Sequence, residues 1–179
     1  MVAAPIYTHP HSLENWLENP PSGTEWVNGE LVEKTGMTLK HSKLQRRLST
    51  VWSNYKDDQG LGGEVYTDVP CRTQKQGRSP DVAYLTPDLL TQYGDAQVLP
   101  QSFPLSAEVV SPTDLAEEVI LKAKEYLASG GLEVWLIYPE SQWVIIVTAA
   151  GQRICSSGET VATTCALPGF KIAVNELLV

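Results

Sequence analysis

Two acidic residues lie in segments whose other residues are largely apolar. Asp81 opens the segment 80–85, and Glu108 lies in the middle of the segment 105–110. An ionised carboxylate in a buried strand is costly unless it is paired or bound to a cation. Two carboxylates on neighbouring strands, with a backbone carbonyl and waters, supply the hard oxygen ligands that Mg²⁺ or Mn²⁺ prefers. The alternative interpretation is that both acids are structural: Asp81 lies on an edge strand, and Glu108 forms a salt bridge with a helix.

The basic residues are concentrated in one part of the chain. The net charge of −8 and the pI near 4.8 argue against a general nucleic-acid binder. Residues 34–78 nevertheless hold nine of the 13 basic residues and only four acids. This segment is interpreted either as solvated helix and loop faces or as a local surface that contacts phosphates. In the second case the nucleic-acid contacts are Lys43, Arg46, Arg47 and Arg78.

Strands and amphipathic helices interleave along the chain, which predicts an α/β (α+β) fold with a mixed β-sheet core flanked by helices. Asn28-Gly29 separates two short strands, so an N-terminal β-hairpin is expected. No linker or repeat is present, so residues 1–179 are expected to form a single domain. The expected helices cover 13–17, 42–56 and 114–127, and the expected strands cover 24–27, 31–34, 64–72, 80–85, 105–110, 133–138, 143–147, 152–155 and 160–167.

Several local signals set the expected boundaries of these elements. Ser42 with Gln45 and Asp114 with Glu117 have the spacing of capping boxes, so each pair is expected to begin a helix. Gly130-Gly131 is expected to end the second of these helices. The segment 86–104 is predicted to be a long loop.

The cysteines and the hydropathy pattern indicate the compartment. The three cysteines include no Cys-x-x-Cys pair, so buried free thiols in a reducing cytosol are expected. The N-terminal segment 1–10 lacks the basic and apolar regions of a signal peptide, and the longest apolar stretches are too short to span a bilayer. We therefore expect a cytoplasmic protein with no membrane partner and no organic cofactor.

Several motifs along the chain form a recognisable combination. They are Ser79-Pro80-Asp81-Val82-Ala83-Tyr84-Leu85, Glu108-Val109-Val110-Ser111-Pro112-Thr113-Asp114, the segment 122–139, Asn28-Gly29-Glu30-Leu31-Val32-Glu33, the helix at His41, and Leu167-Pro168-Gly169-Phe170. In these motifs the sequence resembles the Uma-two family of restriction endonuclease-like proteins. The resemblance spans nearly the whole chain in order, and the combination is specific although each motif alone is weak.

The resemblance implies a fold of the PD-(D/E)XK nuclease superfamily, and it gives three residues a role. Asp81 is then the aspartate of the first half of the signature, and Glu108 is the acid of the second half. The chain departs from the superfamily pattern at Val110, where a lysine would be expected. Lys122 is the expected substitute, which could orient the nucleophilic water or stabilise developing charge. The alternative is a surface Lys122 that pairs with Glu118 one turn earlier.

The resemblance therefore predicts a Mg²⁺-dependent (or Mn²⁺-dependent) endonuclease that acts on DNA. Asp81 and Glu108 would bind the metal, and Lys122 and Glu30 would complete the catalytic set. His41 and Lys124 are expected to give support near the site. A catalytically inactive nuclease-fold binding or scaffold module is the alternative. A homodimer is expected, because two active sites must meet two DNA strands.

Overall fold

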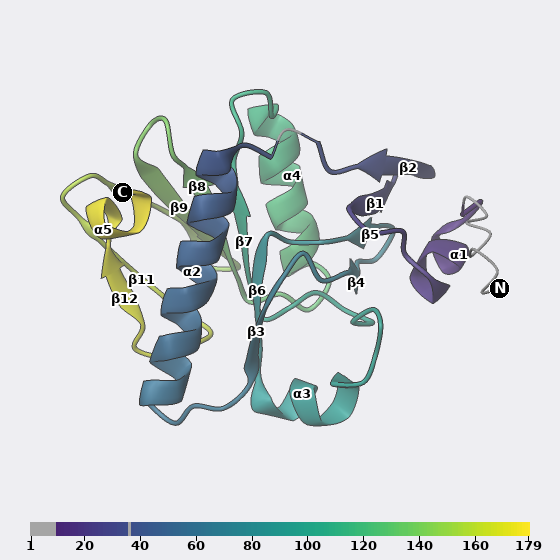
Figure 1. Cartoon of the computed structure of the whole chain (residues 1–179), viewed down its shortest axis with the longest axis horizontal. Coiled ribbons are helices and arrows are strands. Elements are labelled where there is room, and N and C mark those ends of the chain that lie inside the picture. Colours follow the sequence, from purple (N-terminus) through teal and green to yellow (C-terminus); the bar gives the residue numbers. More distant parts are fainter. Residues whose placement is uncertain (1–9, 36) are drawn as a thin grey trace, which may run out of the picture.

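The computed structural model describes residues 10–35 and 37–179. Most of the N-terminal segment on which the signal-peptide prediction rests lies outside these ranges. The main feature of the fold is a six-stranded sheet with the order β10-β9-β8-β7-β6-β3 (Figure 1). Neighbouring strands are antiparallel except β7 and β8, which are parallel. The strands are β3 (Glu64–Thr67), β6 (Val82–Leu85), β7 (Leu105–Val109), β8 (Glu133–Tyr138), β9 (Trp143–Thr148) and β10 (Gly151–Ser156).

A smaller four-stranded sheet with the order β2-β1-β5-β4 lies beside the N-terminal helix α1 (Leu13–Glu18) (Figure 1). The turn between β1 and β2 has φ of 53° at Asn28 and 88° at Gly29, which confirms the predicted hairpin. A side chain at Gly77 would collide with the ring of Trp16, so glycine allows α1 to pack on this sheet. The strands are β1 (Thr24–Val27), β2 (Glu30–Glu33), β4 (Cys71–Arg72) and β5 (Gly77–Arg78).

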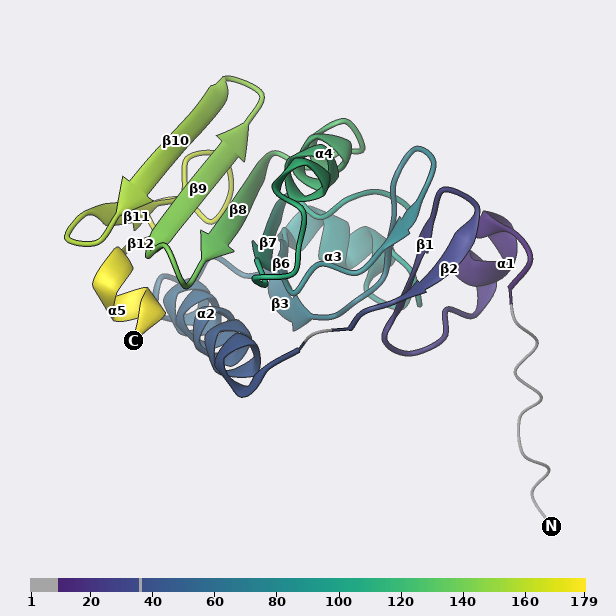
Figure 2. The same cartoon turned by 90° about the horizontal axis from the view of Figure 1, so that it is seen from above.

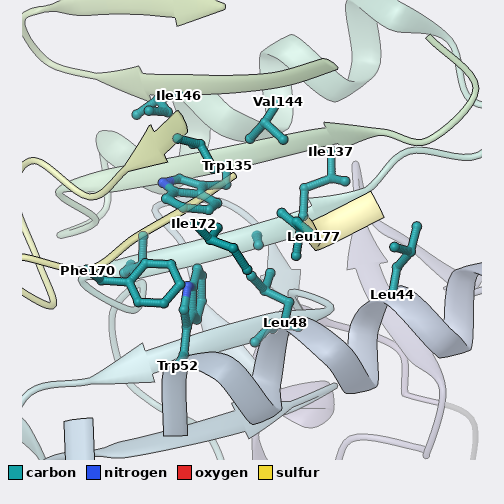
Figure 3. Packing of buried hydrophobic residues seen from close by; sticks show 14 of the residues in the cluster. Leu44, Leu48, Trp52, Trp135, Ile137, Val144, Ile146, Phe170, Ile172 and Leu177 are labelled. Atoms are coloured by element: carbon teal, nitrogen blue, oxygen red, sulfur yellow. The ribbon is translucent and has the colours of Figure 1, made fainter. Parts of the chain in front are cut away.

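Two helices cover opposite faces of the six-stranded sheet, α2 (Leu39–Asp58) and α4 (Ala116–Leu127) (Figure 2). The apolar face of α2 packs on one side of the sheet, where Trp52 meets Trp135 edge to face with ring centroids 5.6 Å apart (Figure 3). The apolar face of α4, with Ala123 and Tyr126, packs on the other side. Burial of these faces supplies most of the driving force for the arrangement.

The C-terminal part of the chain completes the layer on the α2 side. Strands β11 (Thr160–Ala162) and β12 (Lys171–Ala173) form a two-stranded sheet. The last helix, α5 (Val174–Leu178), follows β12 and contacts α2. The ring of Phe170 packs against Trp135, which joins this segment to the core (Figure 3). It also packs edge to face against Tyr55 of α2.

Several boundaries differ from those expected. Helix α2 begins at Leu39, because the hydroxyl of Thr38 accepts a hydrogen bond from the His41 N–H and caps the helix before Ser42. Helix α4 begins at Ala116, and the Asp114 carboxylate accepts a hydrogen bond from the Ser111 N–H instead of capping that helix.

Differences of a second kind concern whole elements. The single strand expected at 64–72 is divided into β3 and β4, and β5 was not expected. The segment expected as a long loop contains α3 (Pro87–Tyr93), whose first residue is a proline. A proline at this position is compatible with a helix, since its missing N–H would be unpaired in any case.

The prediction of a mixed α/β fold with helices flanking the sheet is confirmed. The cysteine prediction is confirmed for Cys71 and Cys155, which are buried and free, and is wrong for Cys165, which is exposed. Within residues 10–35 and 37–179, none of the helices combines the length and the apolar character that crossing a membrane requires.

Candidate active site

Asp81 and Glu108 meet where β6 and β7 run side by side. The antiparallel register pairs Val82 with Ala107, so Asp81 lies opposite Glu108 one position further along. Asp81 is 2% exposed and Glu108 is 8% exposed. The backbone N–H of Val109 donates to Oδ2 of Asp81 at 2.8 Å and ties the aspartate to β7. The two acids that the sequence singled out are therefore brought together in a buried position.

Two cationic side chains balance Asp81. Lys34, directly after β2, places its Nζ 2.9 Å from Oδ1, and His41 in the first turn of α2 places its Nε2 3.4 Å from Oδ2. Burial raises the pKa of Asp81, but His41 and Lys34 outweigh it and hold the pKa of this carboxyl well below its usual range. The contact with Asp81 in turn raises the pKa of His41. The imidazole contact is long and poorly aligned, so it acts as an ion pair more than as a hydrogen bond.

Glu108 has the opposite balance. Burial raises its pKa to about 7, although the nearby Lys122 ammonium favours the ionised form. Its Oε1 accepts a hydrogen bond from the Tyr126 hydroxyl at 2.8 Å and lies 3.0 Å from Nζ of Lys122. Both partners come from α4, which covers the face of the sheet toward which Glu108 points. The two central carboxyl groups thus have pKa values far apart.

Lys122 is held between two carboxylates. Its Nζ lies 2.9 Å from Oε1 of Glu25 on β1 and 3.0 Å from Oε1 of Glu108. Burial lowers its pKa, but Glu108 and Glu25 outweigh burial and keep the pKa above the usual range, so the side chain stays an ammonium. The structure places Lys122 beside Glu108, and none of its ion pairs in the described chain involves Glu118.

Glu25 is buried, and both of its carboxylate oxygens have partners. It pairs with Arg78 at 3.0 Å and accepts a hydrogen bond from the Ser79 N–H at 3.0 Å. Burial raises the pKa of Glu25, but Lys122 and Arg78 lower it by more, to about 2. Arg78 also pairs with Glu125 at 2.8 Å. The structure therefore uses Arg78 inside the protein, where it links β5 to α4, and leaves it no free face for the nucleic-acid contact that the sequence suggested.

The remaining predicted residues fall into two groups. Glu30 is exposed on β2, and Lys124 is exposed on the outer face of α4; no contact in the described part of the chain joins either to Asp81 or Glu108. Lys43 and Arg46 are exposed on α2 and remain available for a partner. Arg47 is half-buried and donates to the backbone oxygen of Glu176.

Sequence reasoning missed Glu25 and Lys34 as members of the site. Glu25 follows the pattern that singled out Asp81, because it is an acid inside a short strand next to a tryptophan, but the segment is less apolar. Lys34 carries no local signal, since it is an ordinary basic residue after a hairpin. Both reach the site from a different sheet.

The carboxylates suit a small divalent cation. Mg²⁺ usually binds one or two carboxylates and keeps several waters. Asp81 and Glu108 provide two carboxylates, and among the described contacts Oε2 of Glu108 accepts no hydrogen bond. Within the described ranges there is no group of three or more His, Cys, Asp or Glu side chains that could hold a metal ion without further ligands. The residues present therefore fit an ion that is held by two carboxylates and completed by water, rather than one enclosed by protein groups.

Comparisons with known proteins agree with this fold. A crystal structure described as "a putative nuclease belonging to DUF820", from Anabaena variabilis, matches with a TM-score of 0.83 at 17% identity, over 94% of this chain and 98% of that chain. This likeness places the chain in the same class of fold. The model of the Uma2 family, described as "Putative restriction endonuclease", matches residues 10–175, so the chain belongs to that family. No curated protein matches the sequence.

Proposed function

We propose that this protein is a Mg²⁺-dependent endonuclease that hydrolyses phosphodiester bonds in DNA, with Asp81 and Glu108 as metal ligands. The observation that carries the proposal is the 3.0 Å contact between Lys122 and Glu108, directly beside Asp81. Two carboxylates and a lysine in one buried cluster, in a member of a restriction endonuclease family, favour hydrolysis over a purely structural ion-pair network. Mn²⁺ is expected to support the reaction in place of Mg²⁺.

The side chains of the cluster have distinct roles in this proposal. Bound Mg²⁺ would polarise the phosphodiester and lower the pKa of the attacking water. Lys122, kept charged by Glu25 and Glu108, would hold that water and stabilise the charge that develops on the phosphate. Tyr126 fixes one oxygen of Glu108 and leaves the other for the metal. Glu25 takes the supporting place that the sequence assigned to Glu30.

Plasmid cleavage in Mg²⁺ tests this assignment. Wild type should nick or linearise the plasmid, Glu108→Gln should be inactive, and Lys122→Met should be slower by about 10²–10³-fold. Lys124→Met is the matched control, because Lys124 lies on the same helix but is exposed, and it should cleave as wild type does. Cleavage by Glu108→Gln at the wild-type rate would rule out the proposed site.

A second candidate function is a nuclease-fold module that binds without cleaving. Asp81 favours it, because Lys34, His41 and the Val109 N–H already surround its two oxygens. This alternative predicts salt-sensitive retardation of DNA by wild type, with no cleavage and no uptake of Mg²⁺.

The proposal extends to the partners. DNA would approach over the N-terminal half of α2, where Lys43 and Arg46 are exposed in the same region as His41. A homodimer, which sedimentation velocity would detect, would present two sites to the two strands of a duplex. The protein is further proposed to act as one domain in the cytoplasm.

A further inference from the structure

The two lysines of the site are held in different ways. Lys122 lies between Glu25 and Glu108, whose side chains are 8% and 10% exposed, so both of its anionic partners are buried. Lys34 pairs with Asp81, whose side chain is 3% exposed, and with Asp68, whose side chain is 39% exposed. An ammonium between two buried carboxylates cannot move without leaving a charge unpaired. Lys34, in contrast, has a partner on the solvent side.

The two oxygens of Asp81 are also used differently. Oδ2 accepts the backbone N–H of Val109 and faces His41, so it is committed to the fold. Oδ1 has one side-chain partner in the described chain, the ammonium of Lys34 at 2.9 Å. The oxygen of Asp81 that the fold leaves available to a cation is therefore the one that Lys34 holds.

Lys34 can give up this contact and remain anchored. Its Nζ lies 2.6 Å from Oδ1 of Asp68 and 2.8 Å from the backbone oxygen of Ser79. The amide of Gln45 donates to Oδ2 of Asp68 and holds that carboxylate in place. Loss of the Asp81 contact would thus leave Lys34 with two partners.

We infer that Lys34 is an exchangeable cation that balances Asp81 in the metal-free protein, is displaced from Oδ1 when a divalent ion binds there, and then contacts the phosphodiester of the substrate. The inference rests on the proposed function, because it takes Asp81 as a metal ligand. Two positive groups on one oxygen repel each other, whereas a phosphate offers the displaced ammonium a new anionic partner. The two lysines then have different roles: Lys34 contacts the phosphate of the substrate, and Lys122 stays paired with Glu108.

Lysine acylation read by mass spectrometry tests the exchange on wild-type protein, with and without saturating Mg²⁺. Acylation of Lys34 should rise severalfold with Mg²⁺, while exposed Lys43 serves as the reference and Lys122 stays protected. Calorimetry gives the second measurement. Lys34→Met should bind Mg²⁺ at least about tenfold more tightly than wild type, because a competing charge is gone. Lys40→Met, which removes a surface charge paired with Glu140, should change the affinity little.

The outcomes separate this inference from the proposed function. Mg²⁺ binding with unchanged acylation of Lys34 would overturn the exchange and leave the metal site intact. Unchanged or weaker binding by Lys34→Met would overturn it as well, and would assign Lys34 to holding Asp81 in position. Failure of wild type to bind Mg²⁺ at all would overturn both the exchange and the proposed function.

Discussion

At the scale of single residues, the site consists of two rows of alternating charges, in which each buried acid contacts a cation. The order runs from Asp68 through Lys34 to Asp81, and from Glu108 through Lys122 to Glu25. Pairing of this kind makes buried charges tolerable but does not make them favourable for folding. Burial raises the pKa of Glu108 to about 7, so the folded protein favours the neutral carboxyl more than the unfolded chain does.

Replacement of Glu108 should therefore stabilise the metal-free protein. The pKa of Glu108 rises from 4.5 to about 7 on folding. Below pH 4.5 the carboxyl is neutral in both states and does not affect the free energy of unfolding. Above pH 7 it is ionised in both states, and the buried charge lowers the free energy of unfolding by its full amount. Glu108→Gln should match wild type near pH 4 and exceed it at pH 8 by up to about 3 kcal/mol. Urea unfolding in EDTA across this pH range measures the difference.

The exposed Glu118→Gln variant is the control and should follow the wild-type pH profile. A Glu108→Gln protein that is less stable than wild type at pH 8 would show that the ion pair with Lys122 outweighs the cost of burying the charge.

At the scale of elements, the site depends on three units that meet at one end of β6 and β7. The hairpin β1–β2 supplies Glu25 and Lys34, the start of α2 supplies His41, and α4 supplies Lys122. The connection between α2 and β3 leads the chain from this helix to the edge strand of the six-stranded sheet. Gly63 in this connection has φ of +72°, and a Cβ there would lie 2.9 Å from the Tyr84 ring and against the backbone oxygen of Leu85.

Gly63→Ala should therefore lower the free energy of unfolding by at least about 3 kcal/mol, through left-handed strain and the clash with β6. Gly60→Ala is a matched control in the same connection, since Gly60 has φ of +62° but open space around it. That variant should lose only about 1 kcal/mol from backbone strain. Equal losses in the two variants, measured by guanidinium unfolding, would contradict the close approach to β6.

The elements that the sequence predicted well are those with a long repeating pattern or a strong local signal. The apolar spacing of Leu44, Leu48 and Trp52 predicted α2, and Asn28-Gly29 predicted the hairpin. The start of α2 was missed because Thr38 competes with Ser42 as the cap, and both have suitable side chains. Two-residue strands such as β4 and β5 carry no periodicity, because their pairing depends on distant neighbours.

The same distinction applies to the site. Asp81 and Glu108 were visible as acids in apolar strands, and Lys122 followed from the family resemblance. Glu25 and Lys34 were not visible, because their place depends on how a separate sheet packs beside β6 and α4. Arg78 shows the opposite case. Its place in a basic segment suggested a contact with nucleic acid, but in the structure it forms internal ion pairs with Glu25 and Glu125.

At the scale of the whole molecule, the net charge of −8 opposes binding to DNA, so any contact must come from a local basic surface. Of the four predicted nucleic-acid contacts, Lys43 and Arg46 on α2 are the two whose side chains are exposed. In a cleavage-deficient Asp81→Asn background, Lys43→Ala with Arg46→Ala should weaken DNA binding and reduce the slope of log K against log salt by about 2. Fluorescence anisotropy across a salt series measures this slope.

A control with the same change of charge comes from the C-terminal strands. Arg153→Ala with Lys171→Ala removes two exposed basic residues from β10 and β12, and should leave the slope close to that of the parent. The same change of slope in both double variants would indicate a general effect of charge, and would contradict a specific contact over α2.

The central claim is that Asp81 and Glu108 form a divalent-metal site. Isothermal titration of wild type with Mg²⁺, and then Mn²⁺, beside Asp81→Asn, Glu108→Gln and the exposed Glu118→Gln tests it most directly. The structure predicts binding by wild type and by Glu118→Gln, and none by the other two variants. Absence of binding by wild type, or binding that survives both active-site substitutions, would contradict the claim and assign the two acids to structural ion pairs with Lys34 and Lys122.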